Sequence, residues 1–98
     1  MLNRDNIELC WNVLAMFGVQ NQRRMIVEEC AELQKAVCKL FRHERDAQYP
    51  EHYQNFIEEL VDVLAVIQEM ILAEGLTMDE VNARIKAKLT KALEDNNV

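Results

Sequence analysis

The segment from residue 60 to residue 73 constrains the fold of this 98-residue chain more than any other. Apolar side chains occur there at most positions, so a helix formed by this segment would be apolar on nearly every face. These residues are Leu60, Val61, Val63, Leu64, Ala65, Val66, Ile67, Met70 and Ile71. Such a helix must be covered on all sides, and a lone domain of this size has few helices with which to cover it. We therefore expect a homodimer or homotetramer with this helix at its interface.

The composition favours an all-α fold. Half of the residues are hydrophobic, and only two Gly and one Pro are present to interrupt helices. At this length we expect a single domain, residues 1–98, with four helices that form an oligomeric helical bundle. The expected helices run from Asp5 or Asn6 to about Phe17, from Gln22 to about Phe41, from Glu51 to Glu74, and from Thr77 toward the C-terminus.

Several residues mark the ends of these helices. Gly18 and Gly75 are placed to end the first and third helices. Asn21 is a plausible N-cap for the second helix, and Pro50 suits the first turn of the third. Thr77, with an acidic residue three positions later, forms a capping box that starts the last helix.

The last helix has an apolar side and a basic side. Val81, Ile85 and Leu89 recur at helical spacing, and we expect them to point inward. A separate face carries basic residues that are either solvated or bind phosphate. These are Arg84, Lys88 and Lys91.

Charge and cysteine content exclude several function classes. The formal net charge of −6 argues against a nucleic-acid partner, because such proteins need a basic face. The longest apolar run is interrupted by Asp62, Gln68 and Glu69, so we expect no membrane span. No signal peptide is evident, and the three cysteines lack metal-type spacing, which favours buried thiols in a reducing cytoplasm. The cysteines are Cys10, Cys30 and Cys38.

Two short acidic clusters lie inside apolar helical runs. Glu29 and Glu32 share a helix face because they are three residues apart, and Glu28 lies at the edge of that face. Glu59 and Asp62 repeat this spacing on the third helix. A single pair of this kind is usually a solvated surface feature. Two pairs flanked by apolar residues favour an all-oxygen site for Mg2+, which would relieve the repulsion between the carboxylates.

Such a site suggests a reaction. Carboxylate-bound Mg2+ usually keeps positions open for water and substrate phosphates, so attack of water on a nucleotide phosphate is the natural chemistry. The chain has no phosphate-binding glycine loop and no serine, so a P-loop enzyme and a serine hydrolase are unsupported. A ferritin-like di-iron site would need Glu-x-x-His, and here the third position after each Glu is Glu32 or Asp62.

The acidic motifs resemble those of the MazG-like all-α nucleoside triphosphate pyrophosphohydrolases. Glu28-Glu29-Cys-Ala-Glu32 and Glu59-Leu-Val-Asp62 match that family's Glu-Glu-x-x-Glu and Glu-x-x-Asp pattern. The resemblance implies Mg2+, with Mn2+ able to replace it, held by Glu29, Glu32, Glu59 and Asp62. It also implies a supporting or water-activating role for Glu28, cleavage to a monophosphate and pyrophosphate, and assembly into dimers or tetramers.

Substrate contacts are expected from residues outside the acidic clusters. Arg84, Lys88 and Lys91 look like the family's phosphate-contacting positions, although nothing selects the nucleotide. Trp11 is either a core anchor or a surface on which a base stacks. The remaining predicted contacts are Gln22, Lys35 and Lys39. The alternative function is a non-catalytic helical oligomer that senses nucleotides or binds a protein partner.

Overall fold

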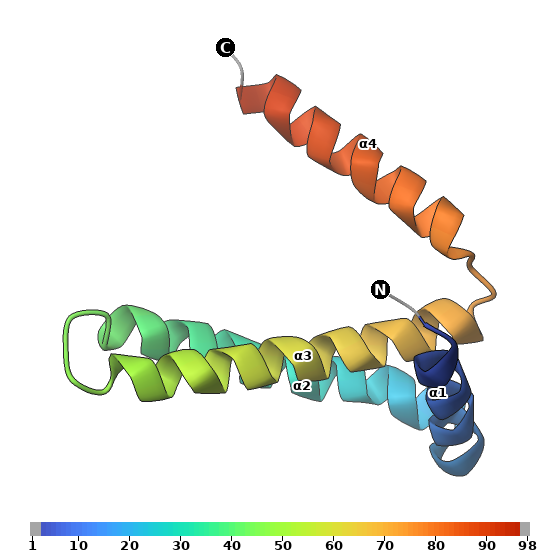
Figure 1. Cartoon of the computed structure of the whole chain (residues 1–98), viewed down its shortest axis with the longest axis horizontal. Helices are drawn as coiled ribbons and strands as arrows, with labels where there is room; N and C mark the ends of the chain where they lie inside the picture. The colour runs from blue at the N-terminus through green and yellow to red at the C-terminus, as the bar shows by residue number, and fades with distance from the viewer. Residues whose placement is uncertain (1–2, 97–98) are drawn as a thin grey trace.

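The computed structural model describes residues 3–96, which form four α-helices (Figure 1). They are α1 (Arg4–Phe17), α2 (Val19–Arg42), α3 (Tyr49–Ala73) and α4 (Met78–Asn96). These residues include no strand, so the predicted all-α class is confirmed. Helices α2 and α3 lie side by side as an antiparallel pair, and α1 crosses the end of the pair where α2 begins and α3 ends. Helix α4 points away from the other three.

The starts of α1 and α2 differ from those expected. Asn3, not Asp5 or Asn6, caps α1: its side-chain oxygen accepts a hydrogen bond of 2.8 Å from the backbone N–H of Asn6. Gly18 ends α1 with a φ of 88°, as expected. Helix α2 begins directly after it, at Val19, so Asn21 is not its N-cap. The Asn21 amide instead donates to the Phe17 carbonyl at 2.7 Å, which links the two helices.

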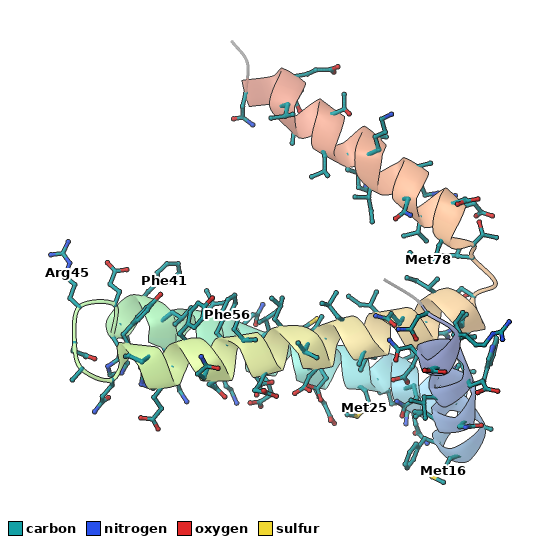
Figure 2. All side chains as sticks on the ribbon, viewed as in Figure 1. Met16, Met25, Phe41, Arg45, Phe56 and Met78 are labelled. Atoms are coloured by element: carbon teal, nitrogen blue, oxygen red, sulfur yellow. The ribbon has the colours of Figure 1, made fainter. Side chains whose placement is uncertain are left out.

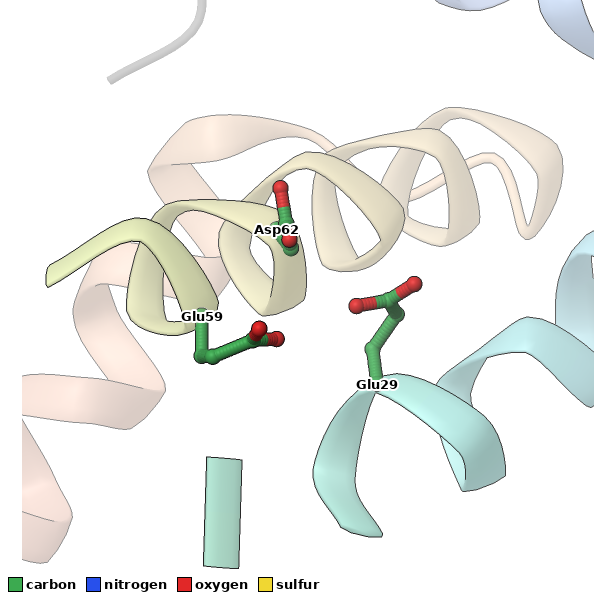
Figure 3. A group of neighbouring side chains, drawn as sticks. All are labelled: Glu29, Glu59 and Asp62. Carbon is green, nitrogen blue, oxygen red and sulfur yellow. The ribbon is translucent and has the colours of Figure 1, made fainter. Parts of the chain in front are cut away.

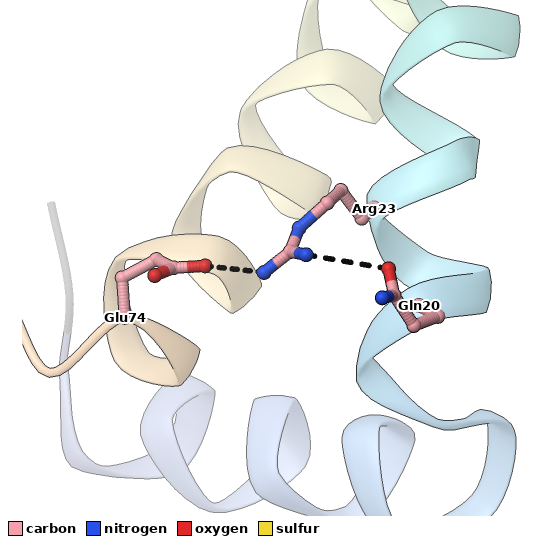
Figure 4. Close-up of polar contacts among 3 residues, drawn as sticks. All are labelled: Gln20, Arg23 and Glu74. Carbon is pink, nitrogen blue, oxygen red and sulfur yellow. Dashed lines mark hydrogen bonds and ion pairs between the residues drawn. The ribbon is translucent and has the colours of Figure 1, made fainter.

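An exposed ion pair joins the start of α2 to the end of α3 (Figure 4). One guanidinium nitrogen of Arg23 lies 2.6 Å from Glu74 Oε1, and the other donates to Gln20 Oε1 at 3.3 Å. Because both charged side chains are about half exposed, we expect the pair to contribute little stability. The pair thus connects two helix ends that lie 51 residues apart in sequence.

The core is small and lies mainly between α2 and α3. Val63, Val66 and Met70 recur at helical spacing on α3 and are buried. Ala36 on α2 is nearly inaccessible, at 1 % exposure, which allows the two helices to approach closely. Cys10 and Leu14 of α1 are also buried. Antiparallel packing of α2 and α3 thus sets the positions of all side chains between them.

The outer face of α3 is apolar but uncovered. Val61 is 54 % exposed, and Leu60, Leu64 and Ile67 also count among the exposed large apolar residues. Helices α1 and α2 cover only part of α3, in agreement with the expectation that a single chain has too few helices to bury it on all sides.

Helix α4 begins where the sequence predicts but packs differently. Gly75 has a φ of 71°, and the Thr77 hydroxyl accepts a hydrogen bond of 3.2 Å from the Glu80 backbone N–H. Within residues 3–96, however, α4 packs against none of the other helices. Ile85 and Leu89 are 45 % and 62 % exposed, so the expectation that they point into a core is wrong for the single chain.

The cysteines do not share one environment. Cys10 is buried, Cys30 is partly buried and Cys38 is exposed. The expectation of three buried core thiols is therefore correct only for Cys10. Cys38 follows the buried Ala36 by two residues, a spacing that places it on the opposite side of α2.

The connection between α2 and α3 is short and ordered by local contacts. The His43 ring stacks on that of His52 with centroids 4.3 Å apart, and His43 Nδ1 lies 2.8 Å from Asp46 Oδ2. This hydrogen bond, with a second from the Gln48 backbone N–H, lowers the pKa of Asp46 below its ordinary value. Pro50 lies in the first turn of α3, as predicted.

Across residues 3–96, none of the four helices has the length and the apolar content needed to cross a lipid bilayer.

Candidate metal centre

Three carboxylates converge in the space between α2 and α3 (Figure 3). Glu29 projects from α2, and Glu59 and Asp62 project from α3. One oxygen from each lies within 4.8 Å of the others. Glu29 and Glu59 are partly buried, whereas Asp62 is exposed, so the group is open to solvent on one side.

Helix geometry explains this convergence. Glu59 and Asp62 are three residues apart, so they occupy neighbouring positions on one face of α3. The packing of Val63 and Val66 against α2 turns that face toward the partner helix, where Glu29 lies. The two acidic motifs, 30 residues apart in sequence, thereby form one group.

The electrostatics of this group are unfavourable for three ionised side chains. Partial burial raises the pKa of Glu29, and the negative charges of Asp62 and Glu59 raise it further. Glu32 and Glu28 add smaller effects in the same direction. No cationic side chain is among the groups that shift the pKa of Glu29. The charged groups that act on the Glu29 carboxylate are therefore all acidic.

The donor set suits a hard divalent cation. Mg2+ and Mn2+ bind carboxylate oxygens and keep several coordination positions for water or phosphate. Three converging carboxylates with one exposed side meet both requirements, and a cation there would remove the repulsion that raises the pKa of Glu29. The residues present thus fit the metal that the resemblance implies.

The other two acidic residues of the motif lie outside this group. Glu32, the fourth predicted ligand, is about half exposed, and its carboxylate lies 3.4 Å from Lys35 Nζ. Glu28, the predicted catalytic residue, is exposed on α2 next to Glu29. Both are close enough to influence the pKa of Glu29. They lie at the rim of the carboxylate group and not at its centre.

The predicted basic contacts fall into two sets. Lys35 and Lys39 are exposed on α2, on the side of Glu29 toward the C-terminus of that helix. The others lie on α4, which points away from the α2–α3 pair, so a single chain does not bring them to the carboxylates. They are Arg84, Lys88 and Lys91.

Gln22, a predicted substrate contact, forms a hydrogen bond within the protein. It is buried, and its side-chain amide donates a hydrogen bond of 2.7 Å to the buried carboxylate of Glu69. Sequence reasoning did not single out Glu69. The spacing in the sequence could have indicated this contact. Glu69 follows Asp62 by seven residues and Gln22 precedes Glu29 by seven, so on two antiparallel helices they lie at the same level. Burial and the charge of Glu69 together raise the pKa of Cys10 nearby.

Trp11 is about half exposed on α1, a position that leaves both predicted roles open.

Comparison with known proteins gives one match. The family model described as the MazG nucleotide pyrophosphohydrolase domain matches residues 17–95, which include all five acidic motif residues. Neither the comparison with curated proteins nor that with solved structures found a match. The matched range covers α2, α3 and nearly all of α4. This chain belongs to the MazG nucleotide pyrophosphohydrolase family.

Proposed function

We propose that this protein hydrolyses a nucleoside or deoxynucleoside triphosphate to the monophosphate and pyrophosphate, and that it needs Mg2+ to do so. The observation that carries the proposal is the convergence of Glu29, Glu59 and Asp62 in a chain of this family. Uncompensated carboxylates in a partly buried group are costly unless a cation binds there. Mn2+ has the same ligand preference and should replace Mg2+.

The three carboxylates have the task of holding the cation. When bound, the cation supplies positive charge that stabilises the charge developing on the phosphate oxygens during hydrolysis. Glu29, Glu59 and Asp62 fix its position from two helices whose packing restricts their movement. Glu32 lies one turn from Glu29 and is proposed to become a fourth metal ligand when substrate binds. Its carboxylate would then leave its ion pair with Lys35.

Glu28 is proposed to orient the attacking water and to accept its proton. It lies beside Glu29 but outside the three-carboxylate group, so its carboxylate remains available as a base. Lys35 and Lys39 are proposed to contact the phosphates from α2, with Trp11 available to stack on the base. Gln22 is withdrawn from this set because its amide is committed to Glu69.

Pyrophosphate release tests the proposal. Turnover would be measured with and without Mg2+ against a panel of canonical and damaged nucleoside triphosphates. We expect Mg2+-dependent release, and we expect Glu59→Gln and Asp62→Asn each to lower kcat by at least about 100-fold, while circular dichroism shows an unchanged helix content. Glu58→Gln is the matched control, because it makes the same change at an exposed neighbour outside the group.

Near-normal turnover in either ligand variant would refute the assignment of the site. Absence of release from every nucleotide, by a folded protein, would instead favour the non-catalytic module that senses nucleotides.

A further inference from the structure

An apolar groove lies between α1 and α3. Figure 2 shows the side chains of these two helices together where α1 crosses the end of the α2–α3 pair. The apolar lining of the groove comes from Leu9, Cys10 and Val13 of α1 and from Val61, Leu64 and Ala65 of α3. Its volume of about 330 Å³ is enough to hold a small organic molecule.

The groove also has a polar part, which contains a buried carboxylate. Asn6, Gln68 and Glu69 line it there. Glu69 is only 7 % exposed, and its hydrogen-bond donor is the Gln22 amide, which bonds Oε1 at 2.7 Å. Within residues 3–96, no buried polar atom of a side chain lacks a hydrogen-bond partner. The other carboxylate oxygen of Glu69, Oε2, is therefore accessible from the groove.

The groove begins next to the three carboxylates of the candidate metal centre. Val61 lines the groove and directly precedes Asp62 on α3. Glu69 follows Asp62 by seven residues, so it lies on the same edge of α3, about 10 Å further along the helix axis. A nucleotide with its phosphates at the carboxylates has the length to place its base beside Glu69.

The chemistry of a carboxylate distinguishes between nucleobases. An ionised carboxylate accepts hydrogen bonds and donates none, so it pairs with an exocyclic amino group such as N4 of cytosine or N6 of adenine. Uracil and thymine present the carbonyl oxygen O4 instead, and two oxygens with no hydrogen between them repel. In an apolar groove such an unmatched polar contact is costly. A base with an amino group should therefore bind more tightly beside Glu69.

We propose that the α1–α3 groove holds the sugar and base of the substrate, and that Glu69 selects a base with an exocyclic amino group. The inference rests on the proposed hydrolysis, because it takes the three carboxylates as the site of the phosphates. Gln22 holds Glu69 in place from α2, and the apolar walls of the groove cover the faces of the base. Trp11 lies outside the groove lining, so the base contacts the groove and not Trp11.

Binding of nucleosides without metal tests the selection separately from hydrolysis. Deoxycytidine and deoxyuridine would be titrated into isotope-labelled protein with chelator, and NMR would give the Kd and the backbone amides that shift. We expect shifts at the groove residues of α1 and α3, and at least about 10-fold tighter binding of deoxycytidine. Glu69→Gln keeps an oxygen for Gln22 and places an NH2 donor in the groove, so it should remove or reverse this preference. Glu58→Gln makes the same change outside the groove and should keep the preference.

Two results would overturn the inference directly. One is equal binding of the two nucleosides by wild type, or shifts outside the groove. The other is an unchanged preference in a Glu69→Gln protein with normal helix content. Ala65→Trp leaves the buried pair intact and fills the groove, so it should weaken binding of both nucleosides by at least about 10-fold. Unchanged affinity in that variant would show that nucleosides bind elsewhere.

Turnover then separates the failure of this inference from the failure of the proposed function. With Mg2+, wild type should have a kcat/KM for dCTP at least about 10-fold above that for dUTP, and Glu69→Gln should lose this difference. Equal turnover of both nucleotides would refute the selection and leave the hydrolysis supported. Selective binding of deoxycytidine without turnover of any nucleotide would refute the hydrolysis and leave the selection supported.

Discussion

Removing one charge from the carboxylate group should stabilise the protein without metal and destabilise it with metal. Glu29→Gln keeps the size of the side chain and one acceptor oxygen, and it replaces the other oxygen by an NH2 donor. It removes two repulsive pairs, with Glu59 and Asp62, whose oxygens lie within 4.8 Å. In a water-like dielectric each pair at that distance is worth about 0.9 kcal/mol. Because the group is open to solvent, salt screening reduces the total to about 1 kcal/mol.

The assay is thermal unfolding at neutral pH and one fixed protein concentration, with chelator or with saturating Mg2+. With chelator, Glu29→Gln should raise Tm by about 4–8 °C, as expected for about 1 kcal/mol in a domain of this size. With Mg2+, wild type gains stability from binding, whereas the variant has lost a ligand and gains less. The order of the two Tm values should therefore reverse when the metal is added.

Glu58→Gln serves as the matched control, because it removes one exposed negative charge on α3 outside the group. It should change Tm little under either condition. A Glu29→Gln protein that is less stable than wild type with chelator would refute the argument, since it would mean that Glu29 makes a favourable contact that outweighs the repulsion. Equal responses of both variants to Mg2+ would refute the assignment of Glu29 as a ligand.

Other predictions concern pH, the buried polar pair and the turn before α4. Because the pKa of Glu29 is raised, the folded metal-free protein retains a proton there that the unfolded chain has lost. Protonated Glu29 therefore adds to the free energy of unfolding at low pH, and this contribution should be lost as pH rises through the pKa of Glu29. Urea titrations should show this pH dependence in wild type but not in Glu29→Gln. Gln22→Leu leaves the Glu69 carboxylate buried without its donor, so urea unfolding should show a loss of about 1–3 kcal/mol. Adding Glu69→Leu to that variant should recover part of the loss, and no recovery would contradict the pairing. Gly75→Ala should lower the free energy of unfolding by about 1 kcal/mol because of the positive φ, and Gly75→Asn should lower it less. Equal effects of Ala and Asn would indicate that φ is not the cause.

Local rules in the sequence were sufficient to predict most helix boundaries. Gly18, Gly75 and Pro50 have backbone requirements that do not depend on tertiary contacts, and each lies where it was expected. The start of α2 was missed because Asn21 follows a common capping pattern. Gly18 allows a new helix to begin at the very next residue, which leaves Asn21 inside α2.

The candidate site could be predicted only in part. The i, i+3 spacing places Glu59 and Asp62 together on any helix, and the antiparallel pairing of α2 and α3 brings Glu29 to them. The same spacing cannot distinguish Glu29 from Glu32, because both share a face of α2. The difference comes from the rotation of α2 about its own axis, which depends on packing against α3 and not on sequence periodicity.

The wrong expectation that the apolar residues of α4 point into the core of the single chain has a related cause. An amphipathic pattern shows that Val81, Ile85 and Leu89 need a partner surface but not which chain supplies it. The outer face of α3 poses the same problem, since α1 and α2 leave it uncovered. Periodicity thus predicts that both surfaces need a partner, but it does not identify that partner.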